Sequence, residues 1–409
     1  MIGAIDATIA GSTNDGIGTP PAGPASIAVL TPWFPNRPGD HNSAFVYDSA
    51  AALSRAGIAV NVLVCRPWTP RGVEFLVPRW TRGTLEADAF RDLARVEVVR
   101  YPSVPLTVFR EFRNWVVRRR VVPRLRALAR GAQLIHVQTE GLAFFGAEVA
   151  RALGVPVVVT VHGLDANLQR RPELRPALAE VDRVLLVGDP LRQPFRAFVG
   201  RDDHFRIVHN GVELPPRARE GAILDERQPI RFISVSNLHE GKGIDVTLRA
   251  LAIAGNQGLG RWHYRIVGEG GEKHALMRLR DELGLAGQVE FAGGQPHARI
   301  YDFLLGADVF VLPSYREAFG IAYLEAMAAG LLAIGVRGQG PEAFIESGKT
   351  GILVEANNPQ ALAQCLLAID RERASMRQIA AAGMGRVKAD FTWEAHAKRL
   401  IGIYRELVS

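Results

Sequence analysis

Short apolar runs rich in β-branched residues alternate with amphipathic stretches along most of the chain. In the first half, such runs lie at residues 26–31 and 58–64, and they recur in "QLIHVQ", "PVVVTVHG", "RVLLVG" and "FRIVHNG". Continuous apolar strands that alternate with helices are typical of parallel sheets covered on both faces. Residues 26–212 are therefore predicted to form a doubly wound, Rossmann-like α/β domain.

The alternation stops at residues 213–229, a polar, proline-containing segment that is predicted to be a linker. It resumes in "IRFISVSN", "HYRIVGEG", "QVEFAGG", "DVFVLPS", "LLAIGVRG" and "GILVEA", so residues 230–388 are predicted to form a second domain of the same α/β type. Residues 389–409 carry apolar side chains near helical spacing, which predicts a terminal amphipathic helix. Because ligands bind beyond the carboxyl ends of parallel strands, two such domains facing each other would form a central cleft for a ligand.

Length and composition agree with two globular domains. A chain of 409 residues exceeds what one core usually supports, and 48% apolar with 22% charged residues is an ordinary globular balance. No apolar run approaches the roughly 18 residues that a transmembrane helix needs. Cys65 and Cys365 form no metal-binding or disulfide pattern, which favours the cytoplasm. Residues 1–25, rich in glycine, proline, serine and threonine, predict a disordered tail.

The positive charge of the chain is concentrated in residues 108–130. This segment holds eight arginines and one glutamate, which equals the net charge of +7 of the whole protein. A nucleic-acid binder would spread its basic residues along a surface, so no nucleic-acid partner is expected. Arginines interspersed with aromatic and aliphatic residues suit an anionic membrane surface, and we assign this contact to Arg113, Arg118, Arg119 and Arg120. A solvated helix with arginine stems over apolar surface, or a pocket for an anionic soluble acceptor, are the alternatives.

The segment "YREAFGIAYLEAMAAG" places Glu317 and Glu325 eight residues apart after an apolar strand. On one helix, their backbones would be about 12 Å apart, farther than the roughly 5–9.5 Å of glycosidase acid pairs. The two glutamates therefore suit the two ends of one elongated ligand. Between them, the backbone amides of Phe319, Gly320 and Ile321 are predicted to be unpaired at a helix start, which favours phosphate.

Two carboxylates on either side of free amides match a nucleotide-sugar, with hydroxyls at both ends and phosphate in the middle. A buried helix with two solvated glutamates is the alternative.

In "VSNLHEGKGIDVTLRA", Lys242 could reach a diphosphate as a point charge, although it could also be a surface lysine in a turn. Gly268 and Gly270 would let a phosphate or base approach a strand end closely. NAD is not favoured there, because Lys273 occupies the position of the third glycine of the dinucleotide fingerprint.

The segment "TVHGLD" places His162 and Asp165 at the end of a first-domain strand, on the opposite side of the predicted cleft. Histidine can donate to a sugar hydroxyl or a phosphate near neutral pH, and a histidine satisfied by backbone groups is the alternative. The sequence has no Asp-x-Asp, so no divalent metal is expected to hold the diphosphate. "AFIESGKT" imitates a P-loop, but Ala343 replaces a required glycine, which argues against an ATPase.

These motifs together resemble those of the retaining GT-B glycosyltransferases of family 4, which build glycolipids and cell-surface polysaccharides. The likeness covers nearly the whole chain after the tail. "EAFGIAYLE" resembles the family's E-x7-E motif, "NLHEGKGID" its phosphate-binding turn, "HGLD" its first-domain histidine motif and "HNGVE" the segment entering its linker. "GQGPEAFIESGKTGILV" is similar to the stretch that closes its nucleotide-sugar site. "FTWEAHAKRLIGIY" is similar to its last helix, which crosses back onto the first domain.

The resemblance implies that Glu317 holds donor-sugar hydroxyls, Glu325 the ribose, and Lys242 the diphosphate. His162 would lie near the reacting carbon in a front-face substitution that keeps configuration. Asn237 stands where many members carry arginine, and Gly39 is what remains of a double-glycine loop on the acceptor side.

The expected protein is a cytoplasmic or peripheral inner-membrane hexosyltransferase without a cofactor. It would transfer sugar from a UDP- or GDP-sugar to a saccharide or lipid-linked acceptor. A nucleotide-sugar epimerase or phosphorylase of the same fold, or a non-catalytic membrane-surface scaffold, are the alternatives.

Overall fold

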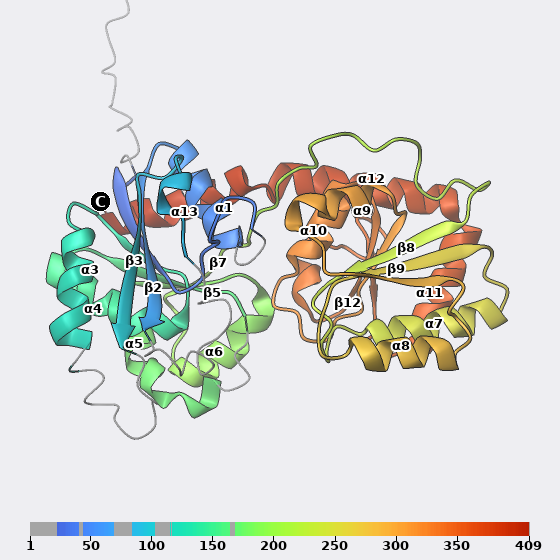
Figure 1. The fold of residues 1–409 in the computed structure, drawn as a ribbon, viewed down its shortest axis with the longest axis horizontal. Coiled ribbons are helices and arrows are strands. Elements are labelled where there is room, and N and C mark those ends of the chain that lie inside the picture. Colours follow the sequence, from blue (N-terminus) through green and yellow to red (C-terminus); the bar gives the residue numbers. More distant parts are fainter. Residues whose placement is uncertain are drawn as a thin grey trace, which may run out of the picture.

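Two α/β domains lie side by side in the computed structural model, and the C-terminal helices run along both (Figure 1). The structure describes residues 23–40, 44–68, 84–102, 115, 117–163 and 168–408. The first domain has a sheet of seven parallel strands in the order β3-β2-β1-β4-β5-β6-β7, and the second a sheet of six in the order β10-β9-β8-β11-β12-β13. The predicted pair of doubly wound α/β domains is therefore confirmed.

The first-domain sheet is buried on both faces, because alternate residues of each strand point to opposite sides. In β1 (Ser26–Thr31), Ile27 and Val29 belong to one buried cluster, whereas Ala28 and Leu30 belong to the other. The sequence of the strand is therefore a continuous apolar run. The other strands are β2 (Ala59–Trp68), β3 (Arg95–Pro102), β4 (Ile135–Val137), β5 (Val157–Val161), β6 (Arg183–Leu186) and β7 (Phe205–Ile207). The helices include α1 (Ala44–Arg55), α3 (Val122–Leu128), α4 (Ala143–Leu153), α5 (Arg175–Glu180) and α6 (Arg192–Val199).

The second domain repeats this layering with a shorter sheet. Its strands are β8 (Ile230–Val235), β9 (Trp262–Val267), β10 (Val289–Gly293), β11 (Val309–Val311), β12 (Leu332–Val336) and β13 (Ile352–Val354). Its helices are α7 (Ile244–Asn256), α8 (Lys273–Glu282), α9 (Ile300–Leu305), α10 (Ile321–Ala328), α11 (Pro359–Arg371) and α12 (Arg373–Asp390). None of the helices in the described ranges is long and apolar enough to span a membrane.

The last helix, α13 (Trp393–Val408), packs on the first domain although it follows the second domain in the chain (Figure 1). Its apolar side is buried in the same cluster as α1, and the imidazole Nε2 of His396 lies 2.8 Å from the hydroxyl of Ser49 on that helix. The crossing is tight, because a Cβ on Gly211 would lie 2.5 Å from the backbone nitrogen of Trp393. This crossing is the one that the family resemblance implied.

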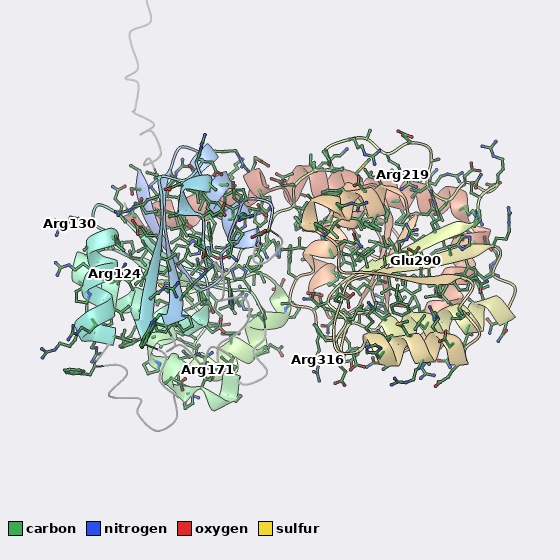
Figure 2. All side chains as sticks on the ribbon, viewed as in Figure 1. Arg124, Arg130, Arg171, Arg219, Glu290 and Arg316 are labelled. Carbon is green, nitrogen blue, oxygen red and sulfur yellow. The ribbon has the colours of Figure 1, made fainter. Side chains whose placement is uncertain are left out.

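Residues 213–229 contain neither helix nor strand, yet they are fixed to the second domain. Arg219, labelled on this segment in Figure 2, reaches the carboxylate of Asp308 at 3.2 Å, and Arg231 reaches the same carboxylate at 2.7 Å. Asp308 is almost completely buried, so two arginines are needed to balance its desolvation. Ile223 and Leu224 are also buried. The polar composition of the segment therefore reflects a buried ion network as well as exposure.

Candidate functional site

The loops that follow the strands of the two sheets meet at the boundary between the domains. A Cβ on Gly188, in the loop after β6, would lie 2.1 Å from the carbonyl oxygen of Ala318, in the turn before α10. Beside this contact, the imidazole of His209 stacks on Phe319 with ring centroids 5.3 Å apart and planes 11° apart. The turn that carries Glu317 to Ile321 therefore lies directly against the first domain.

Two cavities in the described part of the protein lie away from this boundary. One, of about 410 Å³, is lined by the first residues of β8, β9 and β10 and therefore lies at the amino edge of the second sheet. The other, of about 360 Å³, lies between α4 and α5. Ligands of open parallel sheets bind at the carboxyl edge, so we place the functional site at the domain boundary and not in these cavities.

Lys242 and Glu317 form an ion pair at this boundary, with Nζ 2.8 Å from Oε2. Both side chains are mostly buried, with 17% and 14% of their surfaces exposed. The turn that carries Lys242 needs its flanking glycines: Gly241 and Gly243 have φ of 96° and 70°, and a Cβ on Gly243 would lie 2.3 Å from the carbonyl oxygen of Pro313. The turn is fixed to the end of β11, because the Tyr315 amide donates to the Gly241 carbonyl at 2.9 Å.

The backbone of the Glu317 turn is held by the segment after β12. The Glu317 amide donates to the side-chain oxygen of Gln339 at 3.0 Å, and the Gly340 amide donates to the Glu317 carbonyl at 2.9 Å. A Cβ on Gly340 would lie 2.4 Å from the Phe319 backbone nitrogen, so only glycine fits there. Gln339 is a residue that sequence reasoning missed, although it lies in a segment already assigned to the site.

Free amides occur at the start of α10, between the two glutamates. Gly320 has φ of 96° and precedes the first helical residue, Ile321. Within the described ranges, the amides of Phe319, Gly320 and Ile321 have no recorded hydrogen-bond acceptor. The Phe319 side chain is buried against His209, Phe344 and Phe391, so this residue offers only its backbone to a ligand. This arrangement can bind an anion such as phosphate.

Glu325 lies about one and a half helical turns beyond Gly320 and is buried. Burial and, to a smaller extent, the carboxyl of Asp48, on α1 of the other domain, together raise the pKa of Glu325 to about 8. Nε2 of His297 lies 3.7 Å from Oε1 of Glu325. At neutral pH, the carboxyl is therefore mainly protonated, and it can both donate to and accept from a pair of ligand hydroxyls. The alternative of two solvated glutamates is excluded, because Glu317 and Glu325 are both largely buried.

Asp48 is a second titratable group that sequence reasoning missed. Its pKa is raised to about 7, mainly by burial and also by Glu213 at the start of the linker, while Arg55 partly offsets the increase. It lies on an amphipathic helix with no motif around it, so no sequence signal distinguished it. The two domains thus bring carboxyl groups close enough to influence each other.

His162 follows β5 on the first-domain side of the boundary. Its Nε2 lies 2.8 Å from the side-chain oxygen of Gln138, and its ring packs against Phe45 with centroids 4.6 Å apart. Burial and, to a smaller extent, the charge of His396 together lower the pKa of His162 to about 3, so the ring is neutral at physiological pH. Its partner is a side chain and not the backbone group of the alternative interpretation.

Gly268 and Gly270 allow the loop after β8 to pack closely against them. A Cβ on Gly268 would lie 1.8 Å from the carbonyl oxygen of Ser236, and one on Gly270 would lie 2.0 Å from that of Leu238. The loop after β8 occupies this space, so contacts within the protein already require glycine at both positions. The close approach of a ligand to this strand end stays a prediction. Asn237, between the two carbonyls, is exposed at the same edge.

The structure places only one of the remaining predicted cleft residues. Gly39 is exposed and open to solvent, and Asp165 and Arg113 lie outside the described residues. Arg316, which the sequence analysis did not select, is exposed beside the Lys242 turn: its Cδ lies 3.3 Å from the position of a Gly241 Cβ. It adds a cation next to Lys242, at an edge where Asn237 offers no charge.

Residues 117–130 of the arginine-rich segment lie on the outer side of the first domain, where Figure 2 shows Arg124 and Arg130 on and beside α3, far from the second domain. Arg118, Arg119 and Arg120 lie in one turn of π-helix, Val117–Val121, and all three are exposed. Arg118 is paired with Glu148 at 3.3 Å and lies over the Phe144 ring. Arg119 lies over the ring of Trp115, whose surface is 53% exposed.

Buried ionisable groups predict how stability depends on pH. Burial lowers the pKa of His136 and His162 to about 3 and that of His396 to about 4, and it raises that of Asp48 to about 7 and that of Glu325 to about 8. A histidine that stays neutral when folded makes the protein less stable as pH falls below 6.5, because only the unfolded chain then binds the proton. A carboxyl that stays protonated when folded makes the protein less stable as pH rises above about 4, because only the unfolded chain then releases the proton. Burial also lowers the pKa of His209, so four histidines outweigh two carboxyls between these values, and we expect the maximum Tm near pH 6.5.

Thermal denaturation between about pH 5 and about pH 9 checks this expectation. Above pH 6.5, the fall in Tm should become smaller in Glu325→Gln, which removes one titrating group. A Tm that continues to rise up to pH 8, or an unchanged alkaline slope in the variant, would contradict the assignment.

Two family models match the chain. The model described as Glycosyltransferase Family 4 matches residues 43–214, and the model described as Glycosyl transferases group 1 matches residues 219–384. The D-inositol 3-phosphate glycosyltransferase of Corynebacterium urealyticum is 30% identical over 224 residues, and the amylovoran biosynthesis glycosyltransferase AmsK of Erwinia amylovora is 32% identical over 186 residues. These alignments cover 54% and 44% of this chain but only 45% and 46% of the two relatives.

Solved structures share the fold over almost the whole chain. Anabaena HepE, crystallised with UDP, superposes with a TM-score of 0.72 at 17% identity, covering 93% of this chain and 100% of HepE. The sucrose-phosphate synthase of Thermosynechococcus elongatus superposes with a TM-score of 0.71 at 22% identity, covering 93% and 98%. From the two family matches, which adjoin along the sequence, and from the architecture described above, the chain belongs to the family 4 glycosyltransferases of the GT-B fold.

Proposed function

We propose that the protein is a retaining hexosyltransferase. It transfers a sugar from a UDP- or GDP-sugar to a saccharide or lipid-linked acceptor in the synthesis of a cell-surface polysaccharide or glycolipid. The observation that carries this proposal is the Lys242–Glu317 ion pair beside the free amides at the start of α10, with the buried Glu325 further along the helix. The UDP complex of HepE and the name of AmsK support the donor class and the polysaccharide product.

The chemistry follows from charge. When a diphosphate leaves the sugar, negative charge develops on its oxygens, and positive groups fixed at that place lower the barrier. Lys242 and the amides of residues 319–321 supply these groups, and Arg316 adds a third source of positive charge. Glu317 would exchange its contact with Lys242 for hydroxyls of the transferred sugar, while the protonated Glu325 would bind the ribose. His162 would contact the sugar from the first domain.

The test combines binding with product analysis. A thermal-shift panel of nucleoside diphosphates and their sugar conjugates identifies the donor, after which products of the purified protein are separated by chromatography. A transferase releases nucleoside diphosphate and lengthens an acceptor with the donor's anomeric configuration. An altered sugar still attached to its nucleotide would indicate an epimerase, and release of a sugar phosphate a phosphorylase. Absence of binding and turnover across the panel would favour the remaining alternative, a non-catalytic membrane-surface scaffold.

We expect transfer to need no divalent metal. Within the described ranges, no group of three or more His, Cys, Asp or Glu residues is arranged to hold a metal ion. Lys242 and the amides of α10 are placed to neutralise the diphosphate themselves. Activity after treatment with EDTA and desalting should equal that of the untreated protein. Loss of activity that magnesium or manganese restores would contradict this expectation.

We further propose that the protein is cytoplasmic and binds the inner face of the plasma membrane through the outer side of the first domain. Trp115 is exposed there, and no described acidic group pairs with Arg119 or Arg120, whereas Arg118 is engaged by Glu148. Each free arginine near anionic headgroups contributes about 1 kcal/mol at moderate salt. Anionic lipid-linked acceptors would be available at that surface.

Liposome flotation tests this docking. Arg119→Ala/Arg120→Ala should weaken binding to anionic vesicles about thirtyfold, which corresponds to about 2 kcal/mol, and wild-type binding should fall with salt. Arg249→Ala/Arg278→Ala, on exposed positions of α7 and α8, is the matched control and should bind as the wild type does. Equal flotation of all three proteins, insensitive to salt, would end the membrane proposal.

A further inference from the structure

A buried row of polar side chains runs through the first domain, from the C-terminal helix to His162. The hydroxyl of Tyr404 lies 2.6 Å from Nδ1 of His136, and Nε2 of His136 lies 2.7 Å from the hydroxyl of Thr160. Gln138, two residues further along the chain, lies between His136 and His162. The four residues before His162 in this row are all at least nine-tenths buried. Tyr404 belongs to α13, His136 to β4 and Thr160 to β5, and Gln138 follows the end of β4.

The contact between Gln138 and His162 determines the position of a proton. The amide oxygen of Gln138 lies 2.8 Å from Nε2 of His162 and can only accept, so Nε2 must carry the hydrogen. Among the described residues, His396 and His136 interact electrostatically with His162, and burial keeps both of them neutral at physiological pH. In neutral His162, the other ring nitrogen, Nδ1, is therefore an acceptor without hydrogen.

That acceptor has no partner in the described part of the protein. Nδ1 of His162 is buried and makes no hydrogen bond to any described residue. A buried acceptor without a partner costs free energy, which a ligand hydroxyl placed against it would recover. His162 lies at the carboxyl end of β5, the edge at which the donor sugar would lie.

We propose that Gln138 is a positioning residue that holds His162 in its Nε2-protonated form, so that Nδ1 can accept a hydrogen bond from a hydroxyl of the transferred sugar. The inference rests on the proposed function for the identity of that ligand. It departs from the general expectation that this histidine donates, because Gln138 occupies its donating nitrogen. The Tyr404–His136–Thr160 contacts limit the space in which the Gln138 side chain can rotate.

The first experiment reads the tautomer directly and needs no activity. Long-range nitrogen–proton NMR of the full-length protein with labelled histidine distinguishes the two neutral forms, and the signal missing from His162→Gln identifies His162. We expect Nε2-protonated His162 in the wild type and in Gln133→Ala, a control on an exposed glutamine five residues before Gln138. A Nδ1-protonated His162 in the wild type would overturn the proposal, whether or not the protein transfers sugar.

The second experiment uses two replacements of similar size. Gln138→Met removes the acceptor: we expect a mixture of tautomers and a kcat about tenfold lower, the value of one neutral hydrogen bond, with donor Kd unchanged. Gln138→Glu keeps the acceptor and adds a charge that favours protonated His162, so its kcat should fall as pH decreases through a range where the wild type is constant. Native tautomer and kcat in Gln138→Met, with the wild-type pH profile in Gln138→Glu, would refute the proposal. Failure of the wild type to transfer any sugar would refute only the proposed function.

Discussion

Replacing Lys242 with methionine should lower kcat/KM for the nucleotide-sugar by about a hundredfold to a thousandfold. Methionine keeps most of the stem but removes the cation that faces the diphosphate, and such losses of transition-state stabilisation typically have this size. The replacement also leaves Glu317, 2.8 Å from the lost ammonium in the native protein, without its partner. Its carboxylate would then repel the incoming diphosphate, so we expect weaker donor binding as well as slower turnover. Steady-state kinetics and calorimetric titration measure the two effects.

Lys388→Met provides the matched control for this prediction. Lys388 is exposed in the last turn of α12 and belongs to none of the predicted donor contacts, so it should tolerate the same change without effect on kinetics. If Lys242→Met retained wild-type donor affinity and kcat/KM, Lys242 would not be the cation that meets the diphosphate.

Glu317→Gln should separate nucleotide binding from sugar transfer. Glutamine preserves the shape of the side chain but frees Lys242 from its ion pair, so affinity for the nucleoside diphosphate alone should be unchanged or higher. The sugar hydroxyls lose a charged acceptor, and kcat should fall about a hundredfold, the cost of a charge-assisted hydrogen bond made in the transition state. The split between a maintained Kd and a reduced kcat is the diagnostic result.

The control for Glu317→Gln is Glu290→Gln. Glu290 also forms an ion pair, with Arg265 at 2.7 Å, but it lies exposed on β10 (Figure 2). Removing that pair should change neither quantity, because exposed pairs contribute little. A Glu317→Gln protein that transfers sugar at the native rate would show that this carboxylate does not hold the sugar.

The architecture could be predicted because a sheet buried on both faces leaves continuous apolar runs in the sequence. Ile27 and Val29 belong to one core and Ala28 and Leu30 to the other, so burial on both faces produces the uninterrupted apolar runs of a parallel sheet. The segment 213–229 was harder to interpret. Its polar residues indicated an exposed linker, but Arg219 is polar because it neutralises the buried Asp308. Composition alone does not distinguish these two environments.

Within the site, local motifs could be predicted and contacts between distant segments could not. The glycines around Lys242 and the helix start at Gly320 follow from short-range backbone geometry. The pairing of Lys242 with Glu317 joins residues 75 positions apart and depends on how two loops lie on adjacent strands. The influence of Asp48 on Glu325 depends on how the two domains are docked. Gln138 lies in no motif, and only the structure shows that it contacts His162.

The same distinction applies to Gly268 and Gly270. A glycine-rich strand end is equally consistent with a ligand or with a second loop above it, and the sequence did not reveal which. The structure places the carbonyl oxygens of Ser236 and Leu238 there. The glycines therefore shape the edge of the site by allowing two loops to touch.

The central claim is that the turn before α10, with Lys242 and Glu325, binds the nucleoside diphosphate of an activated sugar. A crystal structure of the protein with such a compound bound at saturation tests it most directly. The account predicts diphosphate oxygens within hydrogen-bond distance of Lys242 Nζ and of the amides of residues 319–321, with the ribose hydroxyls on Glu325. A nucleotide bound elsewhere, with the Lys242–Glu317 pair intact and the turn unoccupied, would contradict it.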